Sequence, residues 1–75
     1  MKAIFADDGS EFTADNYFDL VSLIREDCRT PSSDNFEYMK DFARRSVEFD
    51  DLDIRFTNEE EFVSDLESNG LIVII

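Results

Sequence analysis

The last third of the chain shows the clearest alternation of apolar and polar positions. Between positions 52 and 56 every second residue is apolar, and the residues between them are Asp53 and Arg55. The apolar residues of this stretch are Leu52, Ile54 and Phe56. Such alternation predicts a strand that buries one of its two faces.

A helix is predicted directly after this strand. Thr57 stands three residues before Glu60, which is the spacing of a capping box at the start of a helix. Residues 59–61 are glutamates in the expected first turn, where the helix dipole favours negative charge. The apolar face consists of Phe62, Val63 and Leu66. Asn69-Gly70 ends the helix, because glycine takes the left-handed conformation that commonly follows a helix C-terminus.

The final stretch, residues 71–75, has the sequence LIVII and predicts a strand that is apolar on both faces. Such a strand is either central and covered on both sides, or partly available to another molecule. The pattern alone leaves both placements open.

The N-terminal residues 2–14 predict a β-hairpin. Asp8-Gly9 is a dipeptide favoured in two-residue turns, because both central positions of such a turn take positive φ. With this turn, Phe5 lies directly opposite Phe12 on the neighbouring strand.

Two further helices are predicted between the hairpin and the alternating stretch. Asp15 is the expected N-cap of the first, over residues 15–28, and Ser33 or Asp34 that of the second. The apolar face of the first helix consists of Tyr17, Leu20, Val21, Ile24 and Cys28, widened by Phe18 and Leu23. The apolar stripe of the second consists of Phe36, Met39, Phe42, Ala43 and Val47. Whether residues 47–49 continue this helix or begin a strand stays open.

These elements predict one α+β domain over residues 1–75, in the order β-β-α-α-β-α-β. The hairpin and the strand–helix–strand unit would form a small mixed sheet, with the helices packed mainly on one face. A hydrophobic content of 43%, with eight Phe, favours a globular core over a disordered acidic tail. A single cysteine excludes an internal disulfide and fits a cytoplasmic protein. The longest apolar run of five residues is too short to span a membrane.

Of the sequence features, net charge says most about the possible function of the protein. Nineteen Asp and Glu against seven Lys and Arg give a net charge of −12. Because like charges repel, this excess weakens the compact state and does not serve stability. Two explanations stay open: solubility, including adaptation to a salty cytoplasm, or an anionic surface that meets a basic partner. Direct binding to DNA or RNA is disfavoured, because the phosphates would repel the domain.

The residues needed for common catalytic or metal sites are scarce. The chain contains no His, which removes the commonest general base and most zinc sites, and two Gly are too few for a phosphate-binding loop. Glu48, Asp50, Asp51 and Asp53 offer oxygen ligands for calcium or magnesium, but their spacing matches no calcium-binding loop. We therefore expect no enzymatic activity, no cofactor and no metal.

Two acidic clusters are the candidate partner-binding residues. The first consists of Glu59, Glu60, Glu61 and Asp65, and the second of Asp50, Asp51 and Asp53. On so small a body, rows of carboxylates can stand at separations comparable to phosphates on a duplex. They could therefore occupy a Lys/Arg groove built for nucleic acid.

In layout and composition the chain resembles small acidic proteins of phages and mobile elements, and among them anti-CRISPR proteins that mimic DNA. The stretches concerned are MKAIFADDGSEFTADN at the start, YMKDFARR (Tyr38–Arg45), IRF (Ile54–Phe56), EEFVSDL (Glu60–Leu66) and NGLI (Asn69–Ile72). The resemblance implies a non-enzymatic inhibitor, acting in the host cytoplasm, that blocks target DNA binding by a CRISPR effector. The alternative is an acidic antitoxin-like or regulatory binding module, monomeric or a homodimer through the C-terminal strand.

Overall fold

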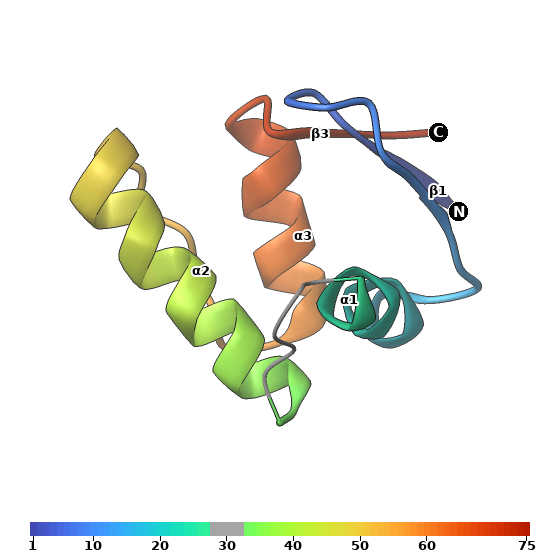
Figure 1. Cartoon of the computed structure of the whole chain (residues 1–75), viewed down its shortest axis with the longest axis horizontal. Coiled ribbons are helices and arrows are strands. Elements are labelled where there is room, and N and C mark those ends of the chain that lie inside the picture. Colours follow the sequence, from blue (N-terminus) through green and yellow to red (C-terminus); the bar gives the residue numbers. More distant parts are fainter. Residues whose placement is uncertain (28–32) are drawn as a thin grey trace.

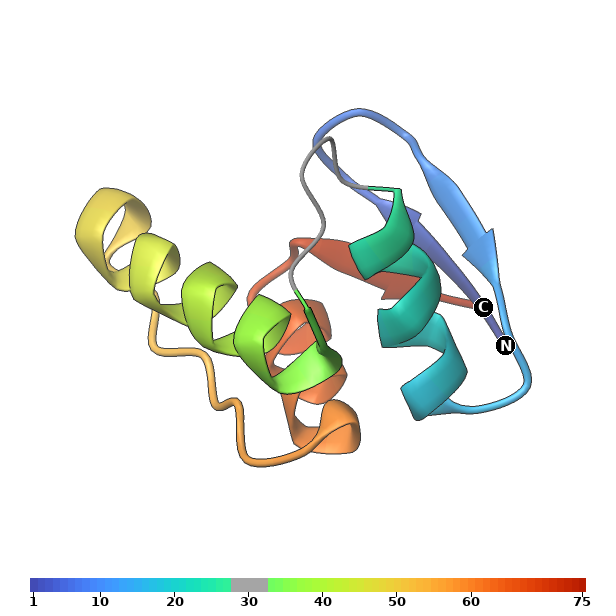
Figure 2. The ribbon, with the colours of Figure 1, turned by 60° about the horizontal axis from the view of Figure 1, so that its bottom comes forward.

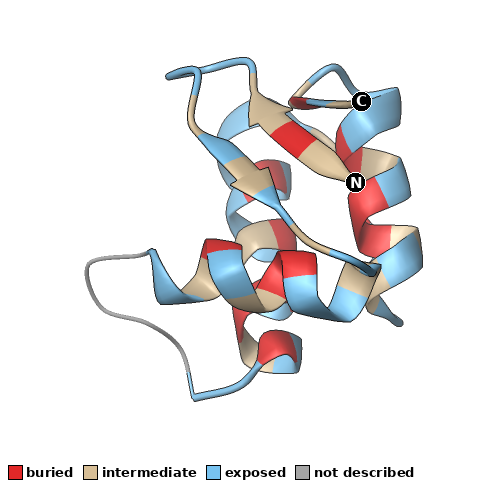
Figure 3. Ribbon diagram, turned by 90° about the vertical axis from the view of Figure 1, so that its right-hand side faces the viewer, coloured by how far each residue is buried: buried red, intermediate tan, exposed pale blue. Residues whose placement is uncertain are grey.

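The computed structural model of this chain describes residues 1–27 and 33–75. Along the described chain, the elements are β1 (Lys2–Phe5), β2 (Glu11–Thr13), α1 (Tyr17–Glu26), α2 (Asn35–Asp50), α3 (Glu59–Ser68) and β3 (Ile72–Ile74) (Figure 1). The sheet lies to one side and the helices pack behind it (Figure 3). The predicted α+β class, with helices mainly on one face of a small sheet, is confirmed.

The sheet has the order β2-β1-β3 and is antiparallel throughout. Ala3, at the centre of β1, pairs with Phe12 of β2 and Ile74 of β3. A parallel pair was expected from the strand–helix–strand unit, but its first strand does not form, so the sheet is not mixed. β3 is consequently an edge strand rather than the central, doubly covered one: Ile72 is buried, whereas Val73 on the opposite face is exposed.

The segment predicted as a strand over residues 52–56 has no regular secondary structure. Its alternation is nevertheless reflected in burial, because Ile54 is only 3% exposed and belongs to the core. The backbone N–H of Arg55 donates to the Asp65 carboxylate at 2.8 Å rather than to a neighbouring strand. The segment is therefore an extended connection that is held against the helices by one apolar side chain and one carboxylate.

The strand pairing of the hairpin is shifted from the predicted register. Ile4 pairs with Glu11, so residues 6–9 form a four-residue loop in which Gly9 has φ +77°. Phe5 therefore lies diagonally to Phe12 instead of directly opposite. Both rings remain on the same face, with centroids 5.9 Å apart in an edge-to-face arrangement.

Every described helix begins at an Asn or Asp side chain that accepts a backbone N–H three residues on. These N-caps are Asn16, Asp34 and Asn58, each at 2.8 Å from its donor. Asp34 was one of the two predicted alternatives, whereas Asp15 and Thr57 each lie one residue too early. Asn and Asp cap at least as well as Thr, so where both stand side by side, Asn58 takes the position.

The buried faces of the helices are narrower than the apolar patterns suggest. On α1, Phe18 and Leu23 are exposed rather than part of the core. On α2, Phe36 and Val47 are exposed as well, and the buried residues are Asn35, Tyr38, Met39, Ala43 and Ser46. The helix accommodates polar Ser46 there because its hydroxyl donates to the Phe42 carbonyl at 3.0 Å. Residues 47–49 are helical, which answers the question left open above; Cys28 lies outside the described residues.

The cap at Asn58 gives the first prediction. Replacing Asn58 with Ala should lower the free energy of unfolding by about 0.5–2 kcal/mol, because the Glu61 N–H loses its acceptor. Thr57→Ala, at the neighbouring exposed residue, is the control and should change stability little. Urea unfolding of both variants provides the measurement, and a larger loss for Thr57→Ala would contradict the observed helix start.

Candidate partner-binding surface

The two predicted acidic clusters lie at opposite ends of one connection. Asp50 is the last residue of α2, and the chain then runs back along this helix to the start of α3 (Figures 1 and 2). Asp50 and Asp51 consequently lie at the C-terminal end of α2, Asp53 follows on the connection, and residues 59–61 lie at the other end. The fold does not combine the clusters into one surface, so each must be judged by its own contacts.

The cluster on α3 is largely engaged in holding the fold together. Asp65 receives two bonds from the Arg55 side chain, each at 2.9 Å, and one from its backbone N–H. The bond from the Arg55 guanidinium holds the pKa of the Asp65 carboxyl below its usual range. Glu61 lies 3.7 Å from the same guanidinium. Charge reversal at Asp65 would therefore break the link between the connection and α3.

Glu59 belongs to a polar network around Asn35, a residue that is only 6% exposed. The Asn35 amide donates to Glu59 at 3.2 Å and to the Ser22 hydroxyl at 3.0 Å, and its oxygen accepts from Arg25 at 2.9 Å. This network joins the starts of α2 and α3 to α1. Burying Asn35 is tolerated because its amide and its carbonyl oxygen both find partners.

Glu60 is the exception in the first cluster. The sequence assigned it a capping role, but with Asn58 as the cap it is exposed and has no side-chain partner among the described residues. It is the one carboxylate of this cluster that the fold does not use. As a binding surface the first cluster is thus reduced to a single free carboxylate.

The second cluster, in contrast, is exposed and, within the described part of the chain, makes no side-chain contacts that hold the fold together. We define the acidic α2 end as Glu48, Asp50, Asp51 and Asp53, which are all exposed. None of these four carboxylates forms a hydrogen bond or an ion pair with a described residue. The last turn of α2 contains no basic residue. Because the C-terminus of a helix carries partial negative charge, carboxylates placed there reduce stability.

The backbone at the acidic α2 end adds a second cost. Asp51 ends the helix in the left-handed conformation with φ 55°, and it is the one non-glycine residue with positive φ in the described chain. The corresponding position after α3 is Gly70, with φ 74°. A residue with a Cβ pays roughly 1–2 kcal/mol for this conformation, although Asp tolerates it better than most. Strain and repulsion thus coincide at one place.

Two exposed apolar side chains accompany these charges. Phe49 is 78% exposed and Val47 53% exposed, both in the last turn of α2. A large aromatic side chain in water is a common component of protein interfaces. Helical spacing from Phe42 and Ser46 places Phe49 on the buried face of α2, so its exposure had no local signal and reflects the end of the core at Ser46.

Other kinds of site find no support in the described part of the chain. No group of three or more Cys, Asp or Glu residues there is arranged to hold a metal ion, the acidic α2 end included. No helix among the described residues is long and apolar enough to cross a membrane. Comparison with family models, curated proteins and solved structures found no match.

The cost at the acidic α2 end can be measured. Asp51→Gly should raise the free energy of unfolding by about 1 kcal/mol, because it removes both the strained Cβ and a carboxylate at a helix C-terminus. The reciprocal variant Gly70→Asp places the same residue after α3 and should lower stability by a similar amount. Thermal and urea unfolding of both variants test this, and a destabilised Asp51→Gly would show that Asp51 serves the fold.

Proposed function

We propose that this protein is a non-enzymatic inhibitor that binds the basic nucleic-acid channel of a host defence complex and competes there with DNA. The resemblance to DNA-mimicking anti-CRISPR proteins makes a CRISPR effector the first candidate for that complex. The single observation that carries the proposal is the acidic α2 end, where free carboxylates gather at a cost to stability.

Solubility alone does not account for this placement. Carboxylates anywhere on the surface increase solubility, and exposed positions such as Asp15 and Glu60, near the N-terminal ends of α1 and α3, provide it without opposing a helix dipole. A residue kept where it weakens the fold is instead typical of functional sites. A basic partner would recover the cost, since its Lys and Arg side chains would neutralise the charges that repel one another.

The geometry also suits approach to a deep basic groove. The buried side chains of α2 end at Ser46, and residues 47–51 are all exposed. The acidic α2 end therefore extends beyond the core and can enter a groove wide enough for a duplex. The remaining negative charge would accelerate the encounter through long-range attraction. Under this proposal the protein acts in the host cytoplasm as a protein-binding module without cofactor.

The proposal predicts an effect that depends on position rather than on net charge. The variant Asp50→Asn, Asp51→Asn, Asp53→Asn should need about tenfold more protein to release DNA from the target complex, because several charge pairs are lost. The control variant Asp15→Asn, Glu26→Gln, Glu67→Gln loses the same number of charges at exposed residues elsewhere. Both variants have a net charge of −9, since three negative charges are removed from −12.

Gel shifts with labelled target DNA and a panel of purified CRISPR effector complexes provide the measurement. The wild-type protein and the control should release DNA from a member of the panel at similar concentrations. Simultaneous binding of DNA and this protein, or equal inhibition by both variants, would contradict the mechanism.

A second candidate function is supported by β3. Ile75 exchanges both backbone hydrogen bonds with Lys2, and Leu71 accepts from Ala6, so the polar backbone groups of Ile72 and Ile74 point away from β1. Such an open edge, beside exposed Val73 and Ile75, can pair with another strand. This favours an acidic antitoxin-like or regulatory module that forms a homodimer through β3.

Sedimentation over a range of concentrations tests this second candidate. A homodimer through β3 predicts mass-action dimerisation that Val73→Lys abolishes, because a lysine at an edge opposes strand pairing. The variant should remain folded, since Val73 is 53% exposed. A wild-type protein that stays monomeric at high concentration would exclude the homodimer.

A further inference from the structure

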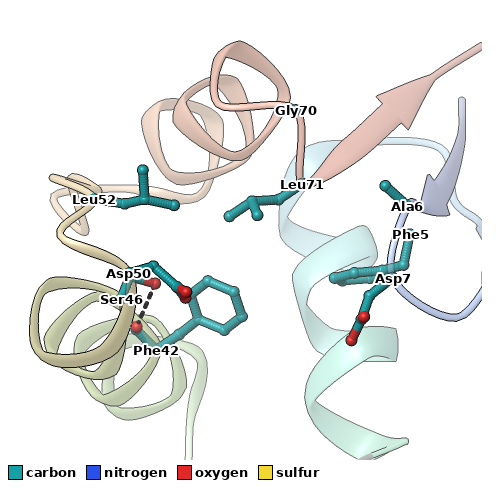
Figure 4. Close-up of a pocket in the computed structure, with 9 residues that line it drawn as sticks. All are labelled: Phe5, Ala6, Asp7, Phe42, Ser46, Asp50, Leu52, Gly70 and Leu71. Carbon is teal, nitrogen blue, oxygen red and sulfur yellow. Dashed lines mark hydrogen bonds between the residues drawn. The ribbon is translucent and has the colours of Figure 1, made fainter.

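An open groove lies between α2 and the sheet, next to the acidic α2 end. Its volume is about 610 Å³. Phe42 and Leu52 line one side and Phe5 the other, while Leu71 extends from the start of β3 toward Leu52 (Figure 4). All four of these apolar side chains are half-buried, so they contact the core and still present surface to the groove.

The polar boundary of the groove is anionic. Asp7 and Asp50 line it from opposite sides, and none of the lining residues is Lys or Arg (Figure 4). Neither carboxylate has a side-chain partner among the described residues, so both are available to a ligand. The buried hydroxyl of Ser46 is already bonded to the Phe42 carbonyl. The site is thus apolar inside and negative at its edges.

We propose that this groove receives one apolar side chain from a Lys/Arg-rich segment of the protein partner. The inference rests on the proposed function and specifies its contact: the apolar side chain enters between Phe42, Leu52 and Leu71, and flanking cations meet Asp7 and Asp50. Charge complementarity determines the kind of occupant. A second copy of this chain would bring carboxylates against carboxylates, with −12 on each body.

This contact would combine two separate contributions to binding. Cations attract the acidic surface of any such protein, and this attraction weakens with salt. An apolar side chain excluded from water adds affinity that salt does not screen, and the walls of the groove make it selective for a residue of suitable size. Specificity would therefore come from the groove and attraction from the charges.

Titration of the ¹⁵N-labelled protein with two synthetic peptides separates these contributions. Each probe is a short peptide of lysines and arginines, with a central leucine in one and a central serine in the other. The leucine peptide should bind at least about tenfold more tightly, with amide shifts at Ser46, Gly70 and Leu71. Raising the salt concentration should weaken the binding of both peptides but leave the ratio of their affinities unchanged.

Two matched variants locate the site. Ala6→Trp places a bulky side chain at the exposed edge of the groove without altering charge, and it should abolish the preference for leucine. Ser64→Trp, at an exposed position of α3 outside the groove, should leave that preference unchanged. The dispersion of the amide spectrum shows whether each variant is folded.

The outcomes distinguish the groove from the wider proposal. Equal affinity for the two peptides, or an unchanged preference in folded Ala6→Trp, overturns the groove as an apolar site while leaving attraction of a basic partner intact. Failure of both peptides to bind at low salt overturns both proposals.

Discussion

The packing of Phe62 at the centre of the domain determines how the other elements are arranged. Its ring is fully buried and packs edge-on against two rings of α2. The ring centroid lies 5.5 Å from that of Phe42 and 6.1 Å from that of Tyr38. Val63 and Leu66 complete the same face of α3, which packs against α1 and β3 as well. Because α2 is held through its first and middle turns, its last turn extends past the core. The exposed, acidic end of α2 is a direct consequence of this packing.

A domain of 75 residues has little stability to spare, which makes the distribution of its carboxylates informative. Glu59 bonds to Asn35 and so joins α3 to α2, while Glu61 and Asp65 pair with Arg55 and so join α3 to the connection. Asp50 and Asp51 do the opposite, because both oppose the dipole of α2 and Asp51 also takes a strained backbone conformation. The same residue types thus serve the fold at one end of the connection and weaken it at the other.

Local chemistry was predictable from the sequence only in part: the N-caps lie at Asn16 and Asn58, one residue after the predicted Asp15 and Thr57, whereas the end of α3 and its buried face are as expected. Gly70 ends α3 as expected, with the Leu71 N–H bonded to the Leu66 carbonyl, and the three buried residues of α3 are those of its apolar pattern. Long-range pairing was not predictable in the same way. The alternation over residues 52–56 is compatible with a strand, but it records only that Ile54 faces inward, since helices rather than strands cover it.

In the candidate site, too, local features were predictable from the sequence and long-range contacts were not. Composition and spacing identified both acidic clusters, but only tertiary contacts show which carboxylates are free. The partner of Asp65 lies ten residues away and that of Glu59 lies twenty-four away, so neither bond has a local signal. The groove beside α2 was also inaccessible to sequence reasoning, because its walls come from β1, α2, the connection and the start of β3.

Competition between this protein and DNA for a basic surface can be tested by affinity capture from a bacterial lysate, followed by elution with duplex DNA. We predict that nucleic-acid-binding proteins are retained, that added DNA displaces them, and that neutralising Asp50, Asp51 and Asp53 prevents their capture. Retained proteins that withstand DNA and bind the neutralised variant equally well would contradict it.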